Sequence, residues 1–182
     1  YGPIRFDQSL LNLDARALAK LYSKLAEAYQ TKEGRRLLQD NPEQLFAPLA
    51  EQAQALLAGN PELRFNEISF NSPFGRTDLK GHARLNGLTL EDFNQPPFLL
   101  LEKLDASTEV SLPYELLLKF ATARADDEEE ALFYTMQFEE QLSALEAKGF
   151  LTRSEKTVST RAAFKNGELT VMDKPFNPLM LD

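Results

Sequence analysis

Apolar residues near the start of the chain recur every three or four positions, as they do along one side of an amphipathic helix. The run after Asp14 has lysine and glutamate between its apolar positions, which are Leu18, Leu21, Leu25 and Ala28. Asp14 itself is a suitable N-cap, because its carboxylate can accept hydrogen bonds from the first free backbone amides. This pattern predicts a helix that begins after Asp14.

A second helix is predicted between residues 41 and 59. Asn41 can cap it, and Pro42 would take the first helical position, where a missing N–H costs nothing. Gly59 suits a left-handed turn at its end. Pro48 falls within about two turns of the start, so it either kinks the helix or marks its true beginning. The apolar positions of this helix are Leu45, Leu49, Leu56 and Leu57.

After the second helix the apolar spacing becomes alternating, which is typical of a half-buried antiparallel strand. Residues 77–86 alternate throughout. One face holds Thr77, Leu79, Gly81, Ala83 and Leu85, and the other holds Asp78, Lys80, His82, Arg84 and Asn86. Residues 64–71 predict an earlier strand, joined to this one by a hairpin turn that contains proline and glycine. Residues 101–113 alternate again, so three strands are expected to share one polar face.

Two helices are predicted after these strands. Pro113 ends the third strand and can open a helix over residues 114–125. The acidic run 126–130 leads into a second helix that Gly149 can end, because acidic side chains complement the dipole at a helix start. The side of this helix that we expect to be buried holds Leu132, Met136, Phe138, Leu142 and Leu145.

The segment from residue 150 to residue 172 predicts a three-stranded meander packed by a helix. Its strands are expected at residues 150–153, 157–164 and 169–172, with a turn at 154–156. Asn166 and Gly167 form a type I′ hairpin signal between the last two strands. The inward positions of the middle strand are Val158, Thr160, Ala162 and Phe164. The tail from Lys174 to Asp182 has two prolines and several apolar residues, so we expect it to wrap the body or contact a neighbour.

These elements together predict an α+β fold, with N-terminal helices followed by a mainly antiparallel, meander-type twisted sheet packed by two or more helices. Residues 1–60 are expected to form a helical segment that packs on the sheet, and residues 61–182 the sheet with its covering helices, as one compact domain. A chain of 182 residues, 43% hydrophobic and 26% charged, has the composition of a soluble protein that folds.

Composition and net charge also limit the classes of partner that we expect for this chain. The net charge of −8 and a pI near 4.8 repel phosphate backbones, so nucleic acid is not an expected partner. The absence of cysteine removes disulfides and thiolate chemistry, and it fits periplasm and cytoplasm equally. The longest apolar run, residues 96–101, is too short to span a membrane. The first residue is Tyr1, so we expect the chain to be a mature product or a piece of something longer.

Candidate chemistry is sparse. His82 is the single histidine and lies on a polar strand face, where a solvated role is favoured over a catalytic one. The acidic run 126–130 lacks the spacing and turn glycine of a calcium loop, so a solvated helix start is the favoured interpretation. Neither Ser72 nor Ser159 lies in a nucleophile elbow, and no phosphate-binding glycine loop occurs.

Two broader features leave alternatives open. Lys80, Arg84 and Lys103 could line up across neighbouring strands as an anion-binding patch, but interleaved acidic residues favour a mixed polar face. Thirteen phenylalanines are expected mostly in the core, yet a groove for acyl chains would use the same residues. We assign no catalytic, cofactor-binding or metal-binding residue, and no cofactor.

Four stretches carry a family resemblance: "LLNLDARALAKLYSKLAEAY" at residue 10, "ISFNSPFGRTDLKGHARLNG" at residue 68, "LDASTEVSLPYELLLKFA" at residue 104 and "LEAKGFLTRSEKTVSTRAAFKNGELTV" at residue 145. Together the chain resembles, over nearly its whole length, the C-terminal part of the YdgA-like family of bacterial envelope proteins of unknown function. One departure is Met172-Asp173-Lys174, where the resemblance predicts an Asn-Gly turn.

The resemblance implies a larger protein of a Gram-negative bacterium, tethered to the inner membrane by an N-terminal segment outside this chain, with its body in the periplasm. It supplies no active-site residues. The favoured hypothesis is a non-enzymatic domain with a protein-interaction or assembly surface, for itself as a homodimer or for another envelope protein, at a free strand edge or at the tail. Lipid or hydrophobic-ligand binding in a groove between sheet and helices is the alternative. A carboxylate-dependent hydrolase acting on an envelope component is the second alternative.

Overall fold

The computed structural model describes residues 2–40 and 49–177, and it divides the chain into two compact units. The sheet unit comprises Tyr1–Ser9, Arg64–Ala83 and Asp105–Asp182, and the helical unit comprises Leu10–Leu63 and Arg84–Leu104. None of the helices in the described part of the chain is both long enough and apolar enough to cross a membrane.

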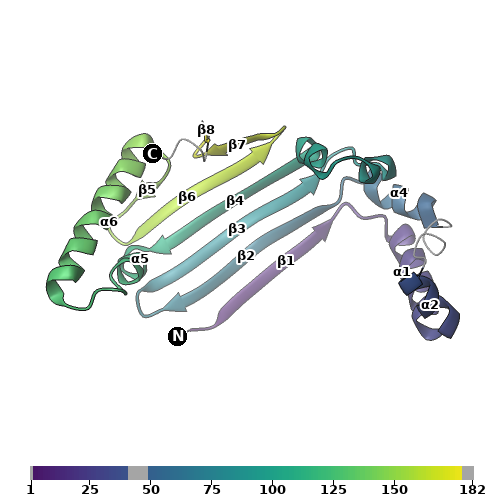
Figure 1. The fold of residues 1–182 in the computed structure, drawn as a ribbon, viewed down its shortest axis with the longest axis horizontal. Helices are drawn as coiled ribbons and strands as arrows, with labels where there is room; N and C mark the ends of the chain where they lie inside the picture. Colours follow the sequence, from purple (N-terminus) through teal and green to yellow (C-terminus); the bar gives the residue numbers. More distant parts are fainter. Residues whose placement is uncertain (1, 41–48, 178–182) are drawn as a thin grey trace. The chain divides into compact units, whose positions relative to one another are not determined.

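Within the described residues, eight strands form one antiparallel sheet in the order β1-β2-β3-β4-β6-β7-β8, with β5 paired to β6 (Figure 1). The strands are β1 Ile4–Leu11, β2 Glu62–Ser72, β3 Gly75–Leu85, β4 Leu104–Pro113, β5 Thr152–Arg153, β6 Thr157–Lys165, β7 Glu168–Val171 and β8 Lys174–Pro175. Strands close in sequence are therefore neighbours in space, so the predicted α+β class and the meander are confirmed. The register of β4 and β6 runs from Asp105 opposite Lys165 to Pro113 opposite Thr157.

Strand β1 was missed by the sequence analysis, which gave no element to Ile4–Leu11. The segment lies within the stretch expected to be helical, yet its apolar residues before Leu11, which are Ile4, Phe6 and Leu10, all fall on alternate, even-numbered positions. Its pairing with β2 begins at Gly2, whose backbone N–H donates to the Asn71 carbonyl at 2.9 Å. β1 is the outer strand on its side of the sheet (Figure 1).

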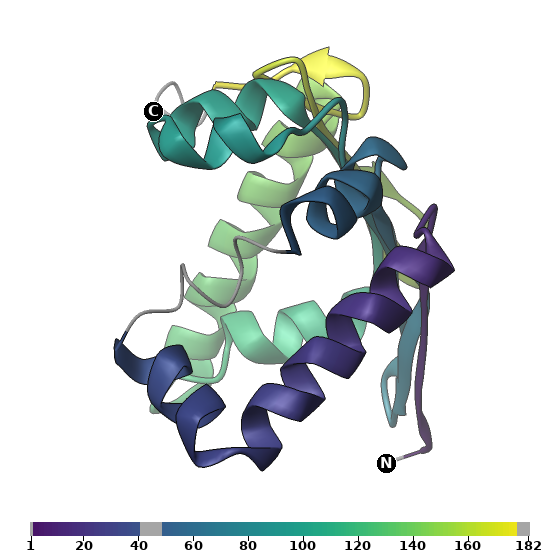
Figure 2. The same ribbon diagram turned by 90° about the vertical axis from the view of Figure 1, so that its right-hand side faces the viewer.

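Helices α5 (Tyr114–Ala121) and α6 (Glu128–Lys148) pack on one side of the sheet (Figure 2). Asp127 caps α6 by accepting from the Glu130 backbone N–H, and Gly149 ends it in the predicted left-handed conformation with φ 74°. The buried cluster beneath these helices consists of Leu142, Leu151 and Val158, with Tyr114, Leu117, Phe138 and Leu145 packed against it.

The buried side of α6 was only partly predicted. Leu142 is buried, and Phe138 and Leu145 pack against the core, as expected. Leu132 and Met136 are exposed, so their predicted burial was wrong. By helical spacing Leu132 and Met136 lie on a different side of α6 from Phe138, Leu142 and Leu145, so the five predicted residues could not all face the sheet.

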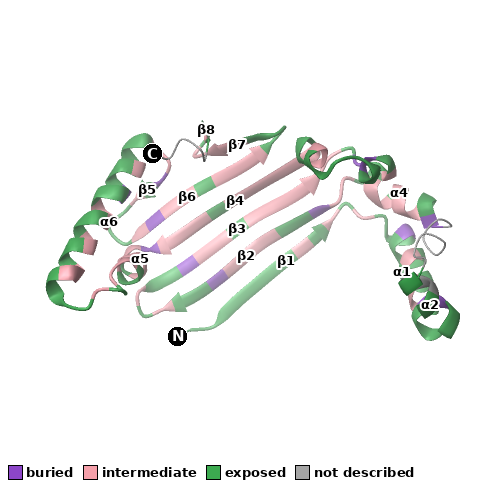
Figure 3. Ribbon diagram, viewed as in Figure 1, coloured by how far each residue is buried: buried purple, intermediate pink, exposed green. Residues whose placement is uncertain are grey.

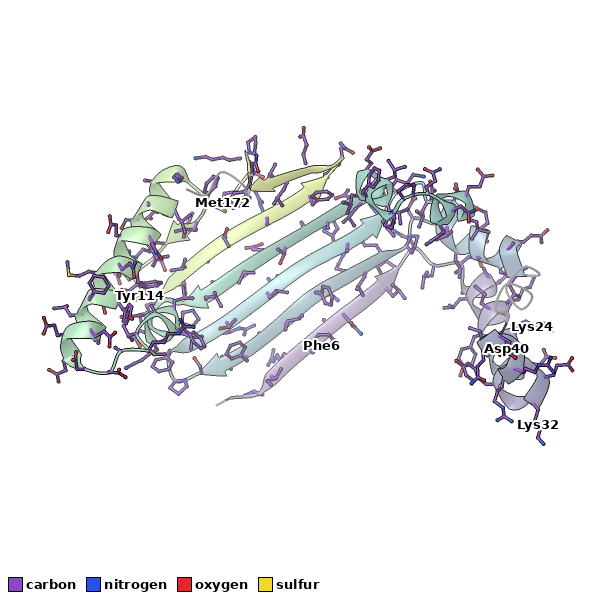
Figure 4. All side chains as sticks on the ribbon, in the orientation of Figure 1. Phe6, Lys24, Lys32, Asp40, Tyr114 and Met172 are labelled. Carbon is purple, nitrogen blue, oxygen red and sulfur yellow. The ribbon has the colours of Figure 1, made fainter. Side chains whose placement is uncertain are left out.

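Two tight turns connect the last strands of the sheet. Asn166 and Gly167 have positive φ angles of 53° and 79°, as the predicted type I′ turn requires. Met172 and Asp173 also have positive φ, and they form the next turn, between β7 and β8 (Figure 4). The chain thus makes its second hairpin where the resemblance predicted an Asn-Gly pair. The predicted tail is described as far as Asn177, and the rest lies outside the described residues.

The helical unit contains α1 (Ala15–Gln30), which begins after Asp14 as predicted. The Asp14 carboxylate accepts from the backbone N–H groups of Arg16 and Ala17, both at 2.9 Å. The other helices of this unit are α2 Lys32–Asp40, α4 Ala50–Ala58 and two 3₁₀ helices, η2 Leu90–Asn94 and η3 Pro97–Lys103. Helix α2 was not predicted.

The predicted second helix is described from α4 onward, and its expected start at Asn41, Pro42, Leu45 and Pro48 lies outside the described residues. The left-handed residue at its end is Asn60, with φ 53°, whereas Gly59 has an ordinary φ of −70°, so the predicted role of Gly59 was wrong. A side chain at position 59 would collide with the Asn12 carbonyl oxygen. Glycine fits this position because the backbone at Asn12 approaches it closely, and not because of the turn geometry.

Most side chains of the sheet are only half-buried (Figure 3). On the face where α5 and α6 pack, Ile68, Leu79, Val110 and Leu112 are all partly exposed, and Phe70 is exposed. β1 is exposed along most of its length. The described core is therefore small, and apolar area of the sheet is left in contact with solvent.

Candidate functional site

His82 lies in a shallow depression of about 350 Å³ on the polar face of the sheet. The Ser107 hydroxyl is 2.9 Å from His82 Nδ1, and His82 Nε2 is 3.5 Å from an oxygen of Asp105. Lys80, Glu109 and Arg161 line the same depression. The structure thus brings a hydroxyl, an imidazole and a carboxylate together, which the sequence analysis did not anticipate.

The contacts around His82 are those of a polar sheet network. The 3.5 Å separation between His82 and Asp105 is longer than a good hydrogen bond. Asp105 also lies 3.9 Å from Lys165, so its charge is shared. Glu109 lies opposite Arg161 in the β4–β6 register, which gives this face alternating charges. A mixed charge distribution of this kind favours neither anions nor cations as ligands.

Lys103, which was considered as part of a basic patch with Lys80 and Arg84, is engaged within the helical unit. Its ammonium group is 2.6 Å from Asp92 and 3.0 Å from the Gly87 carbonyl oxygen. The Thr89 backbone N–H and hydroxyl donate to the same Asp92 oxygen at 2.7 and 2.9 Å. The Lys103 hydrogen bond, with those of Thr89, lowers the pKa of Asp92 from 3.8 to about 2.

The acidic run before α6 has a structural role at the helix start. Asp127 accepts from Glu130 as the N-cap, and the Glu130 carboxylate in turn accepts from the Asp126 backbone N–H at 2.8 Å. Over the described ranges, no group of three or more histidine, cysteine, aspartate or glutamate side chains is placed to hold a metal ion. Ser72 and Ser159 hydrogen-bond to Gly75 and Ser111, respectively.

A charged cluster joins α5, α6 and β5. The Glu139 carboxylate accepts from the Tyr114 hydroxyl and pairs with Arg153 at 2.7 Å. The Arg153 guanidinium also lies 4.9 Å from the centre of the Tyr114 ring. Hydrogen bonding to Arg153 lowers the pKa of Glu139, and the bond to Glu139 raises the pKa of Tyr114. The cluster links the start of α5, at Tyr114 (labelled in Figure 4), to α6 at Glu139.

Carboxyl groups show one common trend across the described residues. Wherever the pKa of a carboxyl departs clearly from its ordinary value, the pKa is lowered, because a cation or N–H donor stabilises the charged form. At Glu67 the hydrogen bond from Ser69 contributes most, and Arg76 adds to it. A general acid that works near neutral pH needs a raised pKa instead.

An apolar groove of about 830 Å³ lies where the end of α6 meets the β6–β7–β8 meander. Its apolar lining consists of Phe150, Phe164, Leu169, Pro175 and Phe176. The rings of Phe150 and Phe176 meet edge to face at 5.3 Å between centroids. Lys148 and Glu168 lie at its rim, so the groove offers an apolar interior with a mixed-charge mouth.

The outer strand β1 carries exposed apolar side chains at the edge of the sheet unit. Ile4 is 78% exposed and Phe6 is 59% exposed. The Phe6 ring rests edge-on against Phe65 of β2, with 6.4 Å between centroids. The Asp7 carboxylate accepts from the Asn66 side chain at 3.2 Å. Within the described residues no strand pairs with the outer side of β1.

A second exposed apolar surface lies on α6. Leu132, Phe133 and Met136 are each more than half exposed, and Phe133 and Met136 line a shallow depression of about 550 Å³. Glutamates at positions 139 and 140 lie beside it. The sequence analysis missed both apolar surfaces. The signals that could have identified them are the short alternation at Ile4–Leu11 and the excess of apolar residues in α6.

Comparison with known proteins gives one match. No curated protein and no solved structure matches the chain. The profile of the family described as "bacterial protein of unknown function (DUF945)" matches residues 1–178, which is nearly the entire chain. The chain therefore belongs to the DUF945 family of bacterial proteins.

Proposed function

We propose that this chain is a non-enzymatic domain of the bacterial cell envelope whose role is to bind protein, either another envelope protein or a second copy of itself. The observation that carries the proposal is the outer edge of β1, an eight-residue strand with exposed Ile4 and Phe6. Proteins usually protect such an edge with charge, proline, a bulge or a covering element. β1 has Arg5 and Asp7 and follows Pro3, yet it also keeps two large apolar side chains exposed. An edge that keeps large apolar side chains is suited to accept a strand from a partner.

The chemistry of the polar groups supports a binding role over an enzymatic one. The clear pKa shifts of carboxyl groups in the described residues are downward, whereas an acid–base hydrolase relies on a carboxyl with a raised pKa. The His82 network lies on an open strand face in a depression of only about 350 Å³. Catalysis of acyl transfer also needs a water-excluded site with oriented donors for the oxyanion.

The proposed envelope location rests on the resemblance of this chain to the YdgA-like family of bacterial envelope proteins. On this proposal the chain lies in the periplasm and is held at the inner membrane by an N-terminal segment of a larger protein. Protease added to intact spheroplasts of the producing bacterium should digest the domain while a cytoplasmic marker protein survives. Protection of the domain until the cells are lysed would contradict the location.

Site-specific photocrosslinking in the producing bacterium tests the binding role. A photoreactive phenylalanine analogue would be placed at Ile4 or Gln8 on β1, and at Tyr22 on α1 as a matched control that is also highly exposed. We expect discrete protein adducts from the β1 positions and none from position 22. Equal yields at all three positions, or no adducts from β1, would contradict the proposal.

A second candidate function, binding of a lipid or other hydrophobic ligand, is favoured by the groove lined by Phe150, Phe164, Leu169 and Phe176. Its volume of about 830 Å³ lies in the range of small-molecule sites. Native mass spectrometry of the protein purified from the periplasm should then show an added mass of several hundred daltons that is lost on denaturation. Phe164→Ala should reduce it, whereas Phe120→Ala, at an exposed ring outside the groove, should not. A bare chain in the unmodified protein would exclude this candidate.

A further inference from the structure

The outer edge of β1 has a defined pattern of hydrogen-bonding groups. Gly2 directs its N–H inward to Asn71 of β2, and backbone groups alternate in direction along an antiparallel strand. Even-numbered residues therefore bond to β2, and the odd-numbered residues Arg5, Asp7 and Ser9 direct their N–H and C=O groups outward. Pro3 also holds an odd position, where its missing N–H faces away from the sheet, as is usual for proline at an edge.

We propose that the partner of β1 is β1 of a second copy of this chain, paired antiparallel about a two-fold axis that passes beside Phe6. The inference rests on the proposed binding role of this edge and names the partner. A two-fold interface joins the same patch on both copies, so the strand must be complementary to itself when its direction is reversed. In the proposed register, the numbers of two residues that lie opposite each other add up to 12, so Phe6 lies opposite Phe6 of the partner copy.

The charges of β1 select this register. Arg5 lies opposite Asp7 of the partner copy, and Asp7 lies opposite Arg5 of the partner copy, which gives two ion pairs on one face. A shift of the axis to Arg5 would place two arginines opposite each other, and a shift to Asp7 would do the same with two aspartates. Like charges directly opposite destabilise a strand pair.

The hydrogen-bonding pattern agrees with the same register. The odd-numbered Arg5 and Asp7 form the hydrogen-bonded pairs, since their backbone groups point outward. Phe6 meets Phe6 of the partner copy in a non-hydrogen-bonded pair, in which side chains approach most closely. The ring is 59% exposed and rests on Phe65, so the two copies would bury a row of aromatic rings across the axis. The sheets of the two copies would then join at their β1 strands and form one continuous sheet.

An axis at Ile4 would place Arg5 opposite Pro3 and lose the ion pairs. A further competing register has its axis at Gln8. It would pair Phe6 with Leu10 of the partner copy, but it would place Arg5 opposite Leu11 and Asp7 opposite Ser9, so both ion pairs would be absent. Disulfide trapping distinguishes the two, because only the residue on the axis meets its own copy. The chain contains no cysteine, so each substitution introduces the single thiol of the molecule.

The trapping experiment uses the full chain with Phe6→Cys, Gln8→Cys or Tyr22→Cys, oxidised under mild conditions after circular dichroism has shown that each variant folds. We expect a disulfide dimer from Phe6→Cys alone. Opposing residues at the axis lie within the Cα distance that a disulfide allows, whereas two Gln8 residues would be about 14 Å apart along the strands. A dimer from Gln8→Cys in place of Phe6→Cys, or from neither, would overturn the proposed pairing.

Charge exchange supplies an independent test by sedimentation of the otherwise unmodified chain. Arg5→Asp or Asp7→Arg alone should weaken the dimer about 10-fold or more, because two attractive pairs become repulsive. The double variant Arg5→Asp with Asp7→Arg should restore the dimer, whereas Lys24→Asp on α1 should have no effect. Failure of the double variant to restore dimerisation would contradict the register.

The photocrosslinking adducts separate this inference from the proposed function. Adducts at Ile4 with twice the mass of the chain would support self-pairing. Adducts with a different protein, together with a monomer in sedimentation, would sustain the binding role and overturn the self-pairing. An absence of adducts and of dimers would overturn both.

Discussion

Met172 and Asp173 hold backbone conformations that few side chains adopt without cost. Their φ angles are 49° and 63°, in the left-handed region that glycine and asparagine tolerate best. They form the turn between β7 and β8, and Asp173 also pairs with Arg161 of β6. Sequence reasoning noted the missing Asn-Gly pair here but could not tell that the turn persists, because its geometry is imposed by the pairing of β8 with β7.

Met172→Gly should therefore stabilise the protein. The substitution relieves a strained φ at a turn residue whose side chain is not part of the described core, so we expect a gain of about 1 kcal/mol in the free energy of unfolding. Urea unfolding followed by circular dichroism would measure it. Thr170→Gly, in the neighbouring strand with ordinary φ, is the matched control and should lower stability. A loss of stability in Met172→Gly would contradict the strain.

Asp92 shows the opposite situation, a residue whose charge is stabilised by its surroundings. Lys103 and Thr89 hold the pKa of Asp92 at about 2 in the folded protein, below the ordinary 3.8. A folded-state pKa below the unfolded one adds stability at pH values above the unfolded pKa. This contribution is lost as the pH falls from about 4 to about 2.

Asp92→Asn should accordingly lower the melting temperature at pH 7, and the difference from the unmodified protein should shrink as the pH falls through this window. Melting curves at pH 7, 4, 3 and 2.5 would test this. Glu91→Gln, next to Asp92, is exposed and should leave the melting temperature unchanged at each pH. A difference that stays constant down to pH 2.5 would show that the charge of Asp92 has no part in it.

Helix α6 illustrates, at the scale of an element, where sequence patterns stop being informative. Its start at Asp127 and its end at Gly149 were predictable, because capping depends on local residues. The residues that it buries were not, because the helix has two apolar sides: Leu132 and Met136 lie on one and Leu142 on the other. Only Leu142 joins Leu151 and Val158 in the core. The choice among the three is made by strands β5 and β6, which follow the helix in the chain.

A pair of leucine substitutions in α6 should show this difference. Leu142→Ala is expected to cost about 2–5 kcal/mol, because it leaves a cavity among packed side chains. Leu132→Ala, at a residue that is 61% exposed, should change the free energy of unfolding by less than about 0.5 kcal/mol. Chemical denaturation of the two variants gives the comparison. Similar losses in both would mean that Leu132 is covered in solution, which would make the α6 surface an interface.

The strands show the same division between local and distant information. The regular alternation at residues 77–86 made β3 predictable, and the Asn166-Gly167 pair identified the β6–β7 hairpin. β1 was missed because its alternation is short and a strong helix follows it. The side-by-side position of β1 and β2 depends on chain segments more than fifty residues apart, which no local pattern reports.

For the molecule as a whole, the fold class could be predicted from the sequence, whereas the exposed apolar surfaces could not. The α+β class and the meander followed from the order of the elements, since strands that follow each other in sequence tend to pair. The candidate interaction surfaces did not follow, because they consist of the apolar residues that the fold leaves uncovered. Ile4 and Phe6 have the same residue types as core positions, and their exposure depends on β1 being the outer strand.

The half-buried sheet side chains have a calorimetric consequence. Unfolding raises the heat capacity mainly by exposing apolar surface, typically by about 12–15 cal/mol/K per residue, or roughly 2.2–2.7 kcal/mol/K for a chain of 182 residues. A sheet that already exposes part of Ile68, Leu79 and Val110 has less surface left to expose. Scanning calorimetry of the monomer should give a value below this range, and a value within it would mean that these side chains are covered. A smaller heat-capacity change flattens the dependence of stability on temperature, so such a domain would lose less of its stability on cooling than a densely packed one.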